Sequence, residues 1–246
     1  MADLFQARGA LRGRDRTVGR LRQQRSSRGD AVRCDDDGNT KADLGYTWSR
    51  PTIARIRVDS ALDGGLVDKY VAVFGGGTIG QFCVQSALAA GAGEVFLVEP
   101  LPARRQLALD FGASATIDPN REDVTDVLRR LTGGIGPDLV LEASGKAVAP
   151  AIHAARKGGR IVLVGLPVKA TSFNFFDLVS TEKEVIGSLS HIYDEDYAAA
   201  VRWLGDGRVL AEPLISARLP LDALVSEGLH RLENAPGETL KVIIRS

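Results

Sequence analysis

From residue 69 to residue 190 the sequence alternates between short apolar runs and segments with helical spacing, which restricts the fold more than any other feature. The runs are rich in β-branched residues and bounded by glycine or proline, as strands are. Each run is apolar throughout, which indicates a strand that is buried on both faces. We expect strands at residues 69–75, 94–99, 115–118, 137–145, 160–167 and 184–190, with helices at 78–91, 101–113, 121–134 and 147–159.

Strands that alternate with helices in this way form a parallel sheet covered by helices. The predicted fold class is α/β, a doubly wound six-stranded Rossmann sheet of strand order 3-2-1-4-5-6. Beyond the sheet, the pattern predicts helices at 193–205 and near 220–233 and a final strand at 239–245. We therefore divide the chain into an irregular extension, residues 1–66, and a Rossmann domain with a C-terminal segment, residues 67–246.

The extension differs sharply from the rest in composition. Residues 1–50 contain ten arginines, one lysine and no glutamate, and they show no helical or strand periodicity. This composition favours a flexible extension. A basic arm for nucleic acid, an arginine-rich transit peptide and a segment ordered by a partner are the alternatives, and the acidic run Asp35 to Asp37 weakens the first two. A shifted or wrongly joined reading frame before residue 67 is a further hypothesis, which the neighbouring DNA would test.

The charges and cysteines exclude several classes of protein. Lysine plus arginine and aspartate plus glutamate both number 31, so the net charge predicts neither a nucleic-acid nor a membrane partner. No apolar run approaches the roughly 18 residues of a membrane span, and we expect a cytoplasmic protein. Cys34 and Cys83 lie far apart without metal-ligand spacing, which argues against a disulfide framework. Helical spacing places Cys83 on a buried helix face as a small packed side chain.

Three glycines follow the first strand and open the first helix. With 27 glycines in the chain, a GxGxxG match alone carries little weight, but this context is specific. Gly75 allows a tight turn, Gly77 lets backbone amides approach a pyrophosphate, and Gly80 lets the helix pack on the sheet. The helix then begins with Thr78 and Ile79, where N–H groups and the positive dipole end favour phosphate. The turn predicts a dinucleotide site.

An acidic residue completes the fingerprint at the end of the second strand. Glu99 lies 19 residues after Gly80, close to the usual spacing of about 20 residues. Its carboxylate can accept hydrogen bonds from both ribose hydroxyls and would repel a 2′-phosphate, so NAD is preferred to NADP. Arg104 and Arg105 follow about a turn later, and either would soften this preference if it contacted the adenosine instead of solvent. A methyltransferase is the competing class, but its GxGxG turn would need glycine where Ile79 stands.

Three longer segments carry a resemblance to a known family. VAVFGGGTIGQFCVQSALAAGAGEVFLVEPLPARRQLALDFGASATID, PDLVLEASG and KGGRIVLVGLP together resemble the cofactor-binding half of the medium-chain, zinc-dependent alcohol dehydrogenases. The polyol and butanediol dehydrogenase branch is the most similar. The resemblance runs from about residue 67 to the C-terminus and implies an NAD cofactor and a homo-oligomer whose interface is formed by the last strands of this domain.

The resemblance also implies that three further segments border the cofactor cleft. One would lie against the nicotinamide carboxamide, one would border the ribose, and one would close the cleft. In that order they are Val164, Gly165 and Leu166, then Ala143, Ser144 and Gly145, then Ser188, Leu189 and Ser190.

The sequence departs from this family at the metal. The resemblance implies a separate domain whose cysteine, GHE segment and acidic residue bind a catalytic zinc, but this chain contains no GHE. Cys34, in DAVRCDDD, does not match the ligand segment, and the four-cysteine loop of structural zinc is missing. In such enzymes zinc polarises the alcohol oxygen so that hydride can leave. We therefore expect no metal site, and a chain that carries the cofactor without activating the substrate.

One histidine is a candidate for acid or base chemistry. His191, in GSLSHIYDED, follows the last sheet strand near the expected cleft, whereas His153 and His230 lie on helices and are expected to be structural or exposed.

The predicted function is that of an NAD-binding oxidoreductase of the alcohol or polyol dehydrogenase type, which transfers hydride between a secondary alcohol and NAD. Its substrate would be a small-molecule alcohol or ketone, and we do not expect catalysis by this chain alone. The alternatives are a non-catalytic dinucleotide-binding module and a subunit that receives its catalytic domain from another chain.

Overall fold

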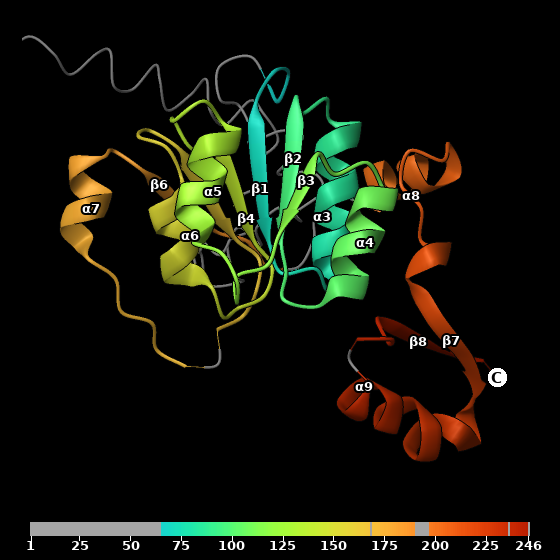
Figure 1. Cartoon of the computed structure of the whole chain (residues 1–246). Helices are drawn as coiled ribbons and strands as arrows, with labels where there is room; N and C mark the ends of the chain where they lie inside the picture. Colours follow the sequence, from blue (N-terminus) through green and yellow to red (C-terminus); the bar gives the residue numbers. More distant parts are fainter. Residues whose placement is uncertain (1–64, 168, 190–196, 236, 246) are drawn as a thin grey trace, which may run out of the picture. The chain divides into compact units, whose positions relative to one another are not determined.

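The computed structural model describes residues 65–167, 169–189, 197–235 and 237–245 (Figure 1). All of them belong to the second of the two units into which the chain divides, Trp48–Ser246. The interpretations of residues 1–64, including Cys34, lie outside the described residues, as do those of Ser190 and His191. They stay predictions.

Six parallel strands form the central sheet, in the order β3-β2-β1-β4-β5-β6. The predicted fold class and strand order are therefore confirmed. The strands are β1 (Tyr70–Phe74), β2 (Glu94–Val98), β3 (Ala115–Ile117), β4 (Leu139–Glu142), β5 (Arg160–Leu163) and β6 (Glu184–Gly187). The helices between them are α3 (Thr78–Ala89), α4 (Pro102–Asp110), α5 (Val124–Leu131), α6 (Val148–Ala154) and α7 (Phe175–Ser180), of which α7 was not predicted.

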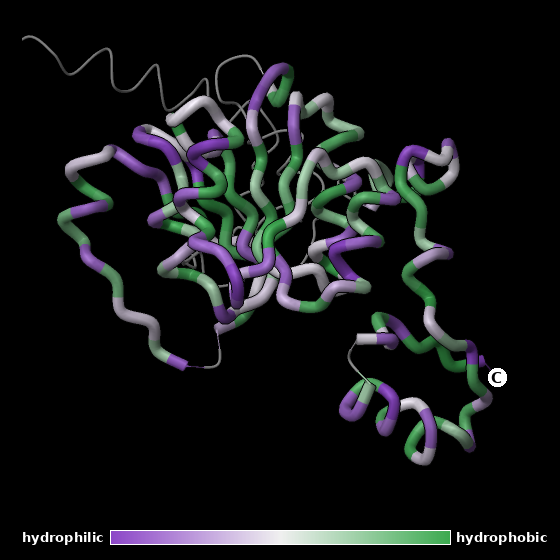
Figure 2. The backbone as a smooth tube through the Cα atoms, in the orientation of Figure 1, coloured by the Kyte–Doolittle hydropathy of each residue, from purple (hydrophilic) through white to green (hydrophobic). Residues whose placement is uncertain are grey.

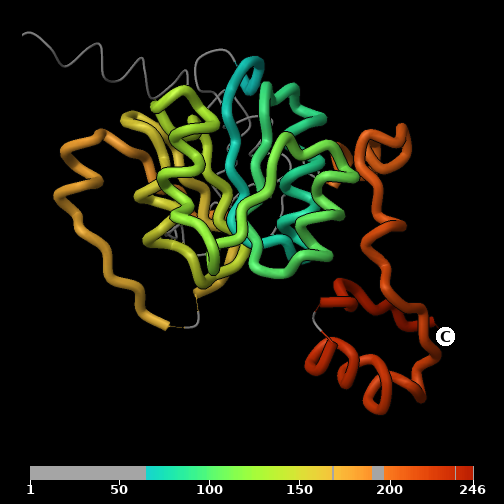
Figure 3. The backbone as a smooth tube through the Cα atoms, in the orientation of Figure 1, coloured from blue at the N-terminus to red at the C-terminus, as the bar shows by residue number. Residues whose placement is uncertain are grey.

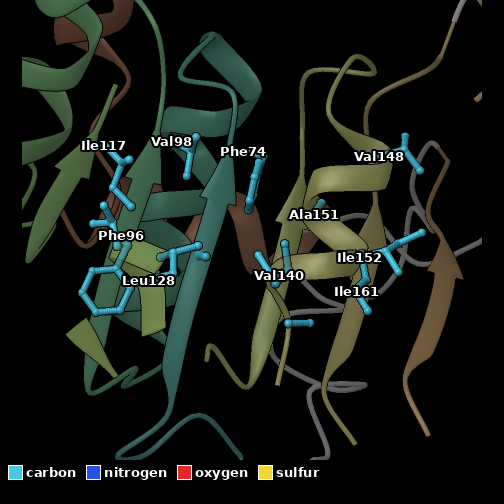
Figure 4. Close-up of a cluster of buried hydrophobic side chains, with 14 residues drawn as sticks. Phe74, Phe96, Val98, Ile117, Leu128, Val140, Val148, Ala151, Ile152 and Ile161 are labelled. Carbon is cyan, nitrogen blue, oxygen red and sulfur yellow. The ribbon is translucent and has the colours of Figure 1, made fainter. Parts of the chain in front are cut away.

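Successive residues of β1 point to opposite faces of the sheet and belong to two separate core clusters. Val71 and Val73 pack with the buried residues of α3, whereas Ala72 and Phe74 pack with those of α5 and α6 (Figure 4). A strand covered by helices on both faces needs apolar residues at every position, which is why these runs do not alternate. Figure 2 shows the hydrophobic residues along the central strands.

Burial confirms one prediction and corrects another. Cys83 is 1% exposed and packs in the cluster under α3, as its helical spacing predicted. The expectation that every strand is covered is wrong for β6, in which Glu184, Val185 and Gly187 are exposed. As the last strand of the sheet, β6 pairs, within the described residues, with β5 alone.

The C-terminal segment continues with α8 (Ala198–Gly205) and the 3-10 helix η2 (Glu212–Leu214) (Figure 3). A two-stranded parallel sheet follows, made of β7 (Ile215–Pro220) and β8 (Lys241–Arg245). The final strand was predicted, but β7 was not. The helix expected near 220–233 consists of three short pieces: 3-10 helix η3 (Leu221–Ala223), π-helix η4 (Leu224–Leu229) and α9 (His230–Asn234). In the described ranges, no helix has the length and apolar character needed to span a membrane.

Candidate functional site

A cavity of about 940 Å³, here the carboxyl-edge cavity, lies where β1, β2 and β4 end. The chain runs from β1 to β2 on one side and returns to β4 on the other, so this is the point at which the strand order reverses. Open α/β sheets bind their ligands at such points. The lining includes six of the predicted cofactor residues: Gly75, Gly77, Glu99, Arg104, Ala143 and Ser144.

The three glycines of the turn differ in what the protein itself requires of them. Gly75 has a φ of +96°, and a Cβ there would lie 2.8 Å from the Cβ of Ser144. A Cβ on Gly80 would lie 1.7 Å from the carbonyl oxygen of Gly75, so α3 can pack this closely only with glycine. A Cβ on Gly77 would meet no atom within 4 Å. Packing therefore accounts for Gly75 and Gly80, while the space over Gly77 is open to a ligand.

Glu99 is held beside this turn by backbone amides. Its side chain accepts hydrogen bonds from the Gly76 N–H at 2.5 Å and from the Leu101 N–H at 3.0 Å, one on each carboxylate oxygen. The residue is only 4% exposed, yet it lines the cavity. A carboxylate offers about four acceptor positions, so two remain for a ligand.

The two arginines of α4 have separate roles. Arg105 forms an ion pair with Asp118 at 3.2 Å and donates to the Glu99 carbonyl oxygen at 2.8 Å, which fixes it in the structure. Arg104 instead lines the carboxyl-edge cavity. Only Arg104 is therefore placed to contact an adenosine there.

Two buried polar residues that support the site were not predicted. Gln81 is fully buried in α3, and its amide donates to the Gly76 carbonyl at 3.2 Å and to the Arg104 carbonyl at 2.8 Å. Glu142, the last residue of β4, is also fully buried and accepts hydrogen bonds from the N–H groups of Ser144 and Gly145, both at 3.0 Å. The Ser144 hydroxyl donates to it as well. The available signal was a charged residue closing an apolar strand, in PDLVLEASG.

The loops after β4 and β5 meet at the same edge of the sheet. A Cβ on Gly165 would lie 2.1 Å from the Gly145 amide nitrogen, and a Cβ on Gly145 would lie 2.5 Å from the Leu166 carbonyl oxygen. This contact brings the predicted nicotinamide segment against the predicted ribose segment. Leu166 itself is 70% exposed.

The other predicted cofactor residues do not line the carboxyl-edge cavity. The Thr78 hydroxyl donates to the Leu240 carbonyl at 3.0 Å, and Ile79 is 52% exposed. Ser188 is buried, and its N–H donates to the Leu163 carbonyl at 2.8 Å. The predicted residues outside the lining are Thr78, Ile79, Gly80, Gly145, Val164, Gly165, Leu166, Ser188 and Leu189. Their contact with a cofactor stays a prediction.

The cavity has a second wall that was not predicted. It comes from the loop before α5 and from α6, and it includes His153, whose Nδ1 lies 3.4 Å from Asp177 Oδ2. These wall residues are Pro119, Glu122, Asp123, Val124, Thr125, Lys146, Ala147, Pro150 and His153.

The described part of the chain does not fit a metal. It contains no group of three histidine, cysteine or acidic side chains placed to share an ion. Burial raises the pKa of the Cys83 thiol to about 12, so Cys83 is neither a thiolate ligand nor a nucleophile at neutral pH. The predicted lack of zinc ligands in the whole chain stays a prediction.

The sheet order, the glycine turn at the switch point and the acid after β2 define a Rossmann-type α/β protein of the dehydrogenase class. Residues 78–206 match the family profile described as zinc-binding dehydrogenase. The chain belongs to this family, the medium-chain zinc alcohol dehydrogenases.

Individual relatives agree with this assignment. A putative D-xylulose reductase of Rhizobium meliloti is 33% identical over 74% of this chain and 53% of that protein. The crystal structure of 2R,3R-butanediol dehydrogenase from Bacillus subtilis superposes with a TM-score of 0.70 at 27% identity, covering 80% of this chain and 56% of that one. A putative zinc-binding dehydrogenase from Sinorhizobium meliloti, solved bound to NADP, gives 0.68 at 30% identity over 79% and 57%. The chain thus spans about half the length of these relatives.

Proposed function

We propose that the carboxyl-edge cavity binds NAD(H) and that the chain supplies the cofactor domain of a dehydrogenase for polyols or other secondary alcohols. One observation carries the proposal: Glu99 is fixed by the Gly76 amide directly beside Gly77, over which the space is open. The pyrophosphate would bind at the turn and the start of α3, and the ribose hydroxyls would donate to Glu99.

The preference for NAD over NADP is part of this proposal. A 2′-phosphate at the ribose would face the buried Glu99 carboxylate, and bringing two negative charges together there is unfavourable. Arg104 and Lys146 are cations that line the same cavity, and Arg104, which lies on α4 and follows Glu99 in the sequence, would offset part of the repulsion. The relative from Sinorhizobium meliloti, bound to NADP, shows that the family includes proteins that accept the phosphate.

Bound NAD would supply the chemistry by accepting hydride from the alcohol carbon. The residues of this chain would hold and orient it. Glu142 bonds to the loop of Ser144 and Gly145, and Gly165 packs against that loop. These contacts support the proposal that the two segments together border the ribose and the nicotinamide. The polyol or secondary-alcohol substrate is inferred from the named relatives.

A second candidate function is that of a cofactor-binding subunit that works with the metal-binding domain of another chain. It is favoured by the lack of a three-residue metal group among the described residues. It is also favoured by apolar side chains on the C-terminal segment, where Leu221 is 67% and Val225 is 71% exposed. Such residues are suited to a partner surface.

Both candidates are tested by following NADH formation with the purified chain, NAD and a panel of polyols and secondary alcohols, with and without added zinc. Turnover that removal of zinc abolishes would support a complete dehydrogenase. NADH binding without turnover would favour the subunit or a non-catalytic binding module, and turnover restored by a zinc-domain chain would single out the subunit. If the chain shows no NADH binding and no turnover, that result would contradict the proposal.

We further propose that the protein is a homo-oligomer joined through β6. The exposed edge of this strand, including Val185, is the surface that supports pairing with a second copy. Light scattering should give a dimer or larger assembly, and Val185→Lys should shift it to a monomer. We also propose that the protein is cytoplasmic, which cell fractionation would test.

A further inference from the structure

A second cavity, of about 710 Å³, lies at the opposite edge of the sheet from the glycine turn. Its residues come from α5, α6 and α7 and from the loops that lead from these helices into β4, β5 and β6, so we call it the amino-edge cavity. Its basic lining residues are Arg129, Arg156, Lys157 and Lys183, and Asp177 is its acidic one. The volume lies in the range of small-molecule sites, roughly 300–1,000 Å³.

Lys183 is the most unusual residue of this cavity. Its side chain is only 3% exposed, and its ammonium lies 3.6 Å from Asp177 Oδ2 and 3.4 Å from the His153 carbonyl oxygen. Strong charge-assisted hydrogen bonds are about 2.7–2.9 Å long, and an ammonium has three donors. Burial lowers the pKa of Lys183, Asp177 opposes this effect, and the positive charge of Arg129 adds to it. Lys183 is thus a buried cation whose two contacts, with Asp177 and the His153 carbonyl, are both longer than the strong charge-assisted range.

The other cations of the cavity divide into two kinds. Arg156 is committed to the structure, because its Nε lies 2.7 Å from Asp138 Oδ1 and its Nη1 donates to the Lys157 carbonyl. Arg129 and Lys157 are exposed, and within the described ranges neither side chain forms an ion pair. Apart from Arg156, the lining therefore contains three cations, Arg129, Lys157 and Lys183, and one carboxylate, that of Asp177.

A simpler explanation is that these cations only balance the ends of helices. α5, α6 and α7 all end near the cavity, and carbonyl groups at a helix C-terminus attract positive charge. This explanation accounts for exposed cations such as Arg129. It does not require a lysine buried beside a ligand-sized cavity with only long contacts.

We propose that the amino-edge cavity binds the phosphate group of a small molecule, with Lys183, Arg129 and Lys157 neutralising its charge. A multiply charged anion suits three cations that share one acid. The proposal does not depend on NAD binding, because Lys183, Arg129 and Lys157 do not line the carboxyl-edge cavity. The two linings have His153 in common.

The test is calorimetric titration of the full chain with inorganic phosphate, pyrophosphate and glucose 6-phosphate at constant ionic strength. We expect saturable binding that Arg129→Gln and Lys183→Met each weaken about tenfold, as for the loss of a charged hydrogen bond. Arg130→Gln is the matched control, since Arg130 is the next residue of α5, is also exposed and does not line the cavity. It should leave the affinity unchanged.

Phosphate could also bind at the glycine turn, so Gly77→Ala is included to separate the two sites. Binding that survives Gly77→Ala but not Arg129→Gln supports the amino-edge cavity. Equal affinity for inorganic phosphate and glucose 6-phosphate would identify the free ion as sufficient, while tighter binding of the ester would identify a phosphorylated metabolite. No saturable binding, equal loss in Arg130→Gln, or loss in Gly77→Ala alone would overturn the proposal.

Discussion

At the scale of single residues, the structure separates two glycines that the fold needs from a third that packing does not require. Gly75 and Gly80 have no room for a side chain, whereas Gly77 has open space around its Cβ position. The sequence motif predicted a role for each of the three glycines, but it did not distinguish a glycine required by packing from one required by a bound ligand. That distinction depends on Ser144 and on the Gly75 carbonyl, which approach from elsewhere in the fold or from the turn itself.

Substituting these glycines should therefore give opposite results. Gly77→Ala should change the free energy of unfolding by no more than about 0.5 kcal/mol, because φ −68° and ψ −176° suit alanine. It should weaken NADH binding at least about tenfold, since the methyl group would occupy the space for the pyrophosphate. Gly80→Ala should destabilise by about 1–3 kcal/mol or more through overpacking. Urea unfolding and NADH titration of both variants check this, and NADH binding at full strength by Gly77→Ala would contradict it.

Replacing Glu99 by glutamine should reduce cofactor discrimination. Glu99→Gln removes the charge that would repel a 2′-phosphate, so we expect NADH to bind about tenfold more weakly and the difference between NADH and NADPH to shrink. Glu122→Gln is the control, because Glu122 lines the same cavity but is exposed. Fluorescence titration with both cofactors measures the ratio. An unchanged ratio in Glu99→Gln would show that Glu99 does not contact the ribose.

The buried thiol gives a prediction about pH. Because burial raises the Cys83 pKa from 9.0 to about 12, the unfolded chain ionises first. The stability due to the neutral buried thiol is complete below pH 9 and is lost as the pH rises toward 12. In a Cys34→Ser background, Cys83 should react with a thiol reagent at pH 8 only as fast as the protein unfolds. Rapid reaction of the folded protein would contradict its burial.

At the scale of helices and strands, apolar periodicity predicted the elements whose packing is uniform. Strands β1, β2, β4 and β5 contribute side chains to the core clusters on both faces of the sheet, so their sequences were recognisable without knowing their neighbours. β7 was missed because Ser216 and Arg218 interrupt its apolar residues and it ends at Pro220, so it is not a continuous apolar run, although its alternation is typical of a half-buried strand. α7 was missed because its six residues are too few for helical periodicity to be recognised, and none of them is buried.

The first turn of α5 offers a test at this scale. The Asp123 side chain accepts a hydrogen bond from the Asp126 N–H at 2.9 Å and so caps the helix. Asp123→Ala should lower the free energy of unfolding by about 1 kcal/mol. Glu122→Ala, next to it and also exposed, should have an effect within about 0.5 kcal/mol. Chemical denaturation of the two variants provides the comparison, and equal losses would show that the cap contributes nothing.

At the scale of the whole molecule, the fold and the family could be predicted from the sequence, and much of the site's wall could not. The glycine turn and Glu99 are adjacent to one strand each, so a local motif found them. Glu142 bonds only to its own loop, and Gln81 reaches both the turn and the Arg104 carbonyl, 23 residues away. Neither residue belongs to the glycine motif, and the wall from α6 meets the turn only in the folded chain. The substrate could not be predicted from the sequence, because the chain matches only about half the length of its relatives.

The most direct test of the proposed cofactor site is a calorimetric titration of the purified full chain with NADH and, in parallel, with NADPH. Glu99 beside an open glycine turn predicts NADH binding in the micromolar range, NADPH binding at least about tenfold weaker, and loss of both in Gly77→Ala. Absence of binding by either cofactor, or tighter binding of NADPH, would contradict the assignment of the carboxyl-edge cavity to NAD.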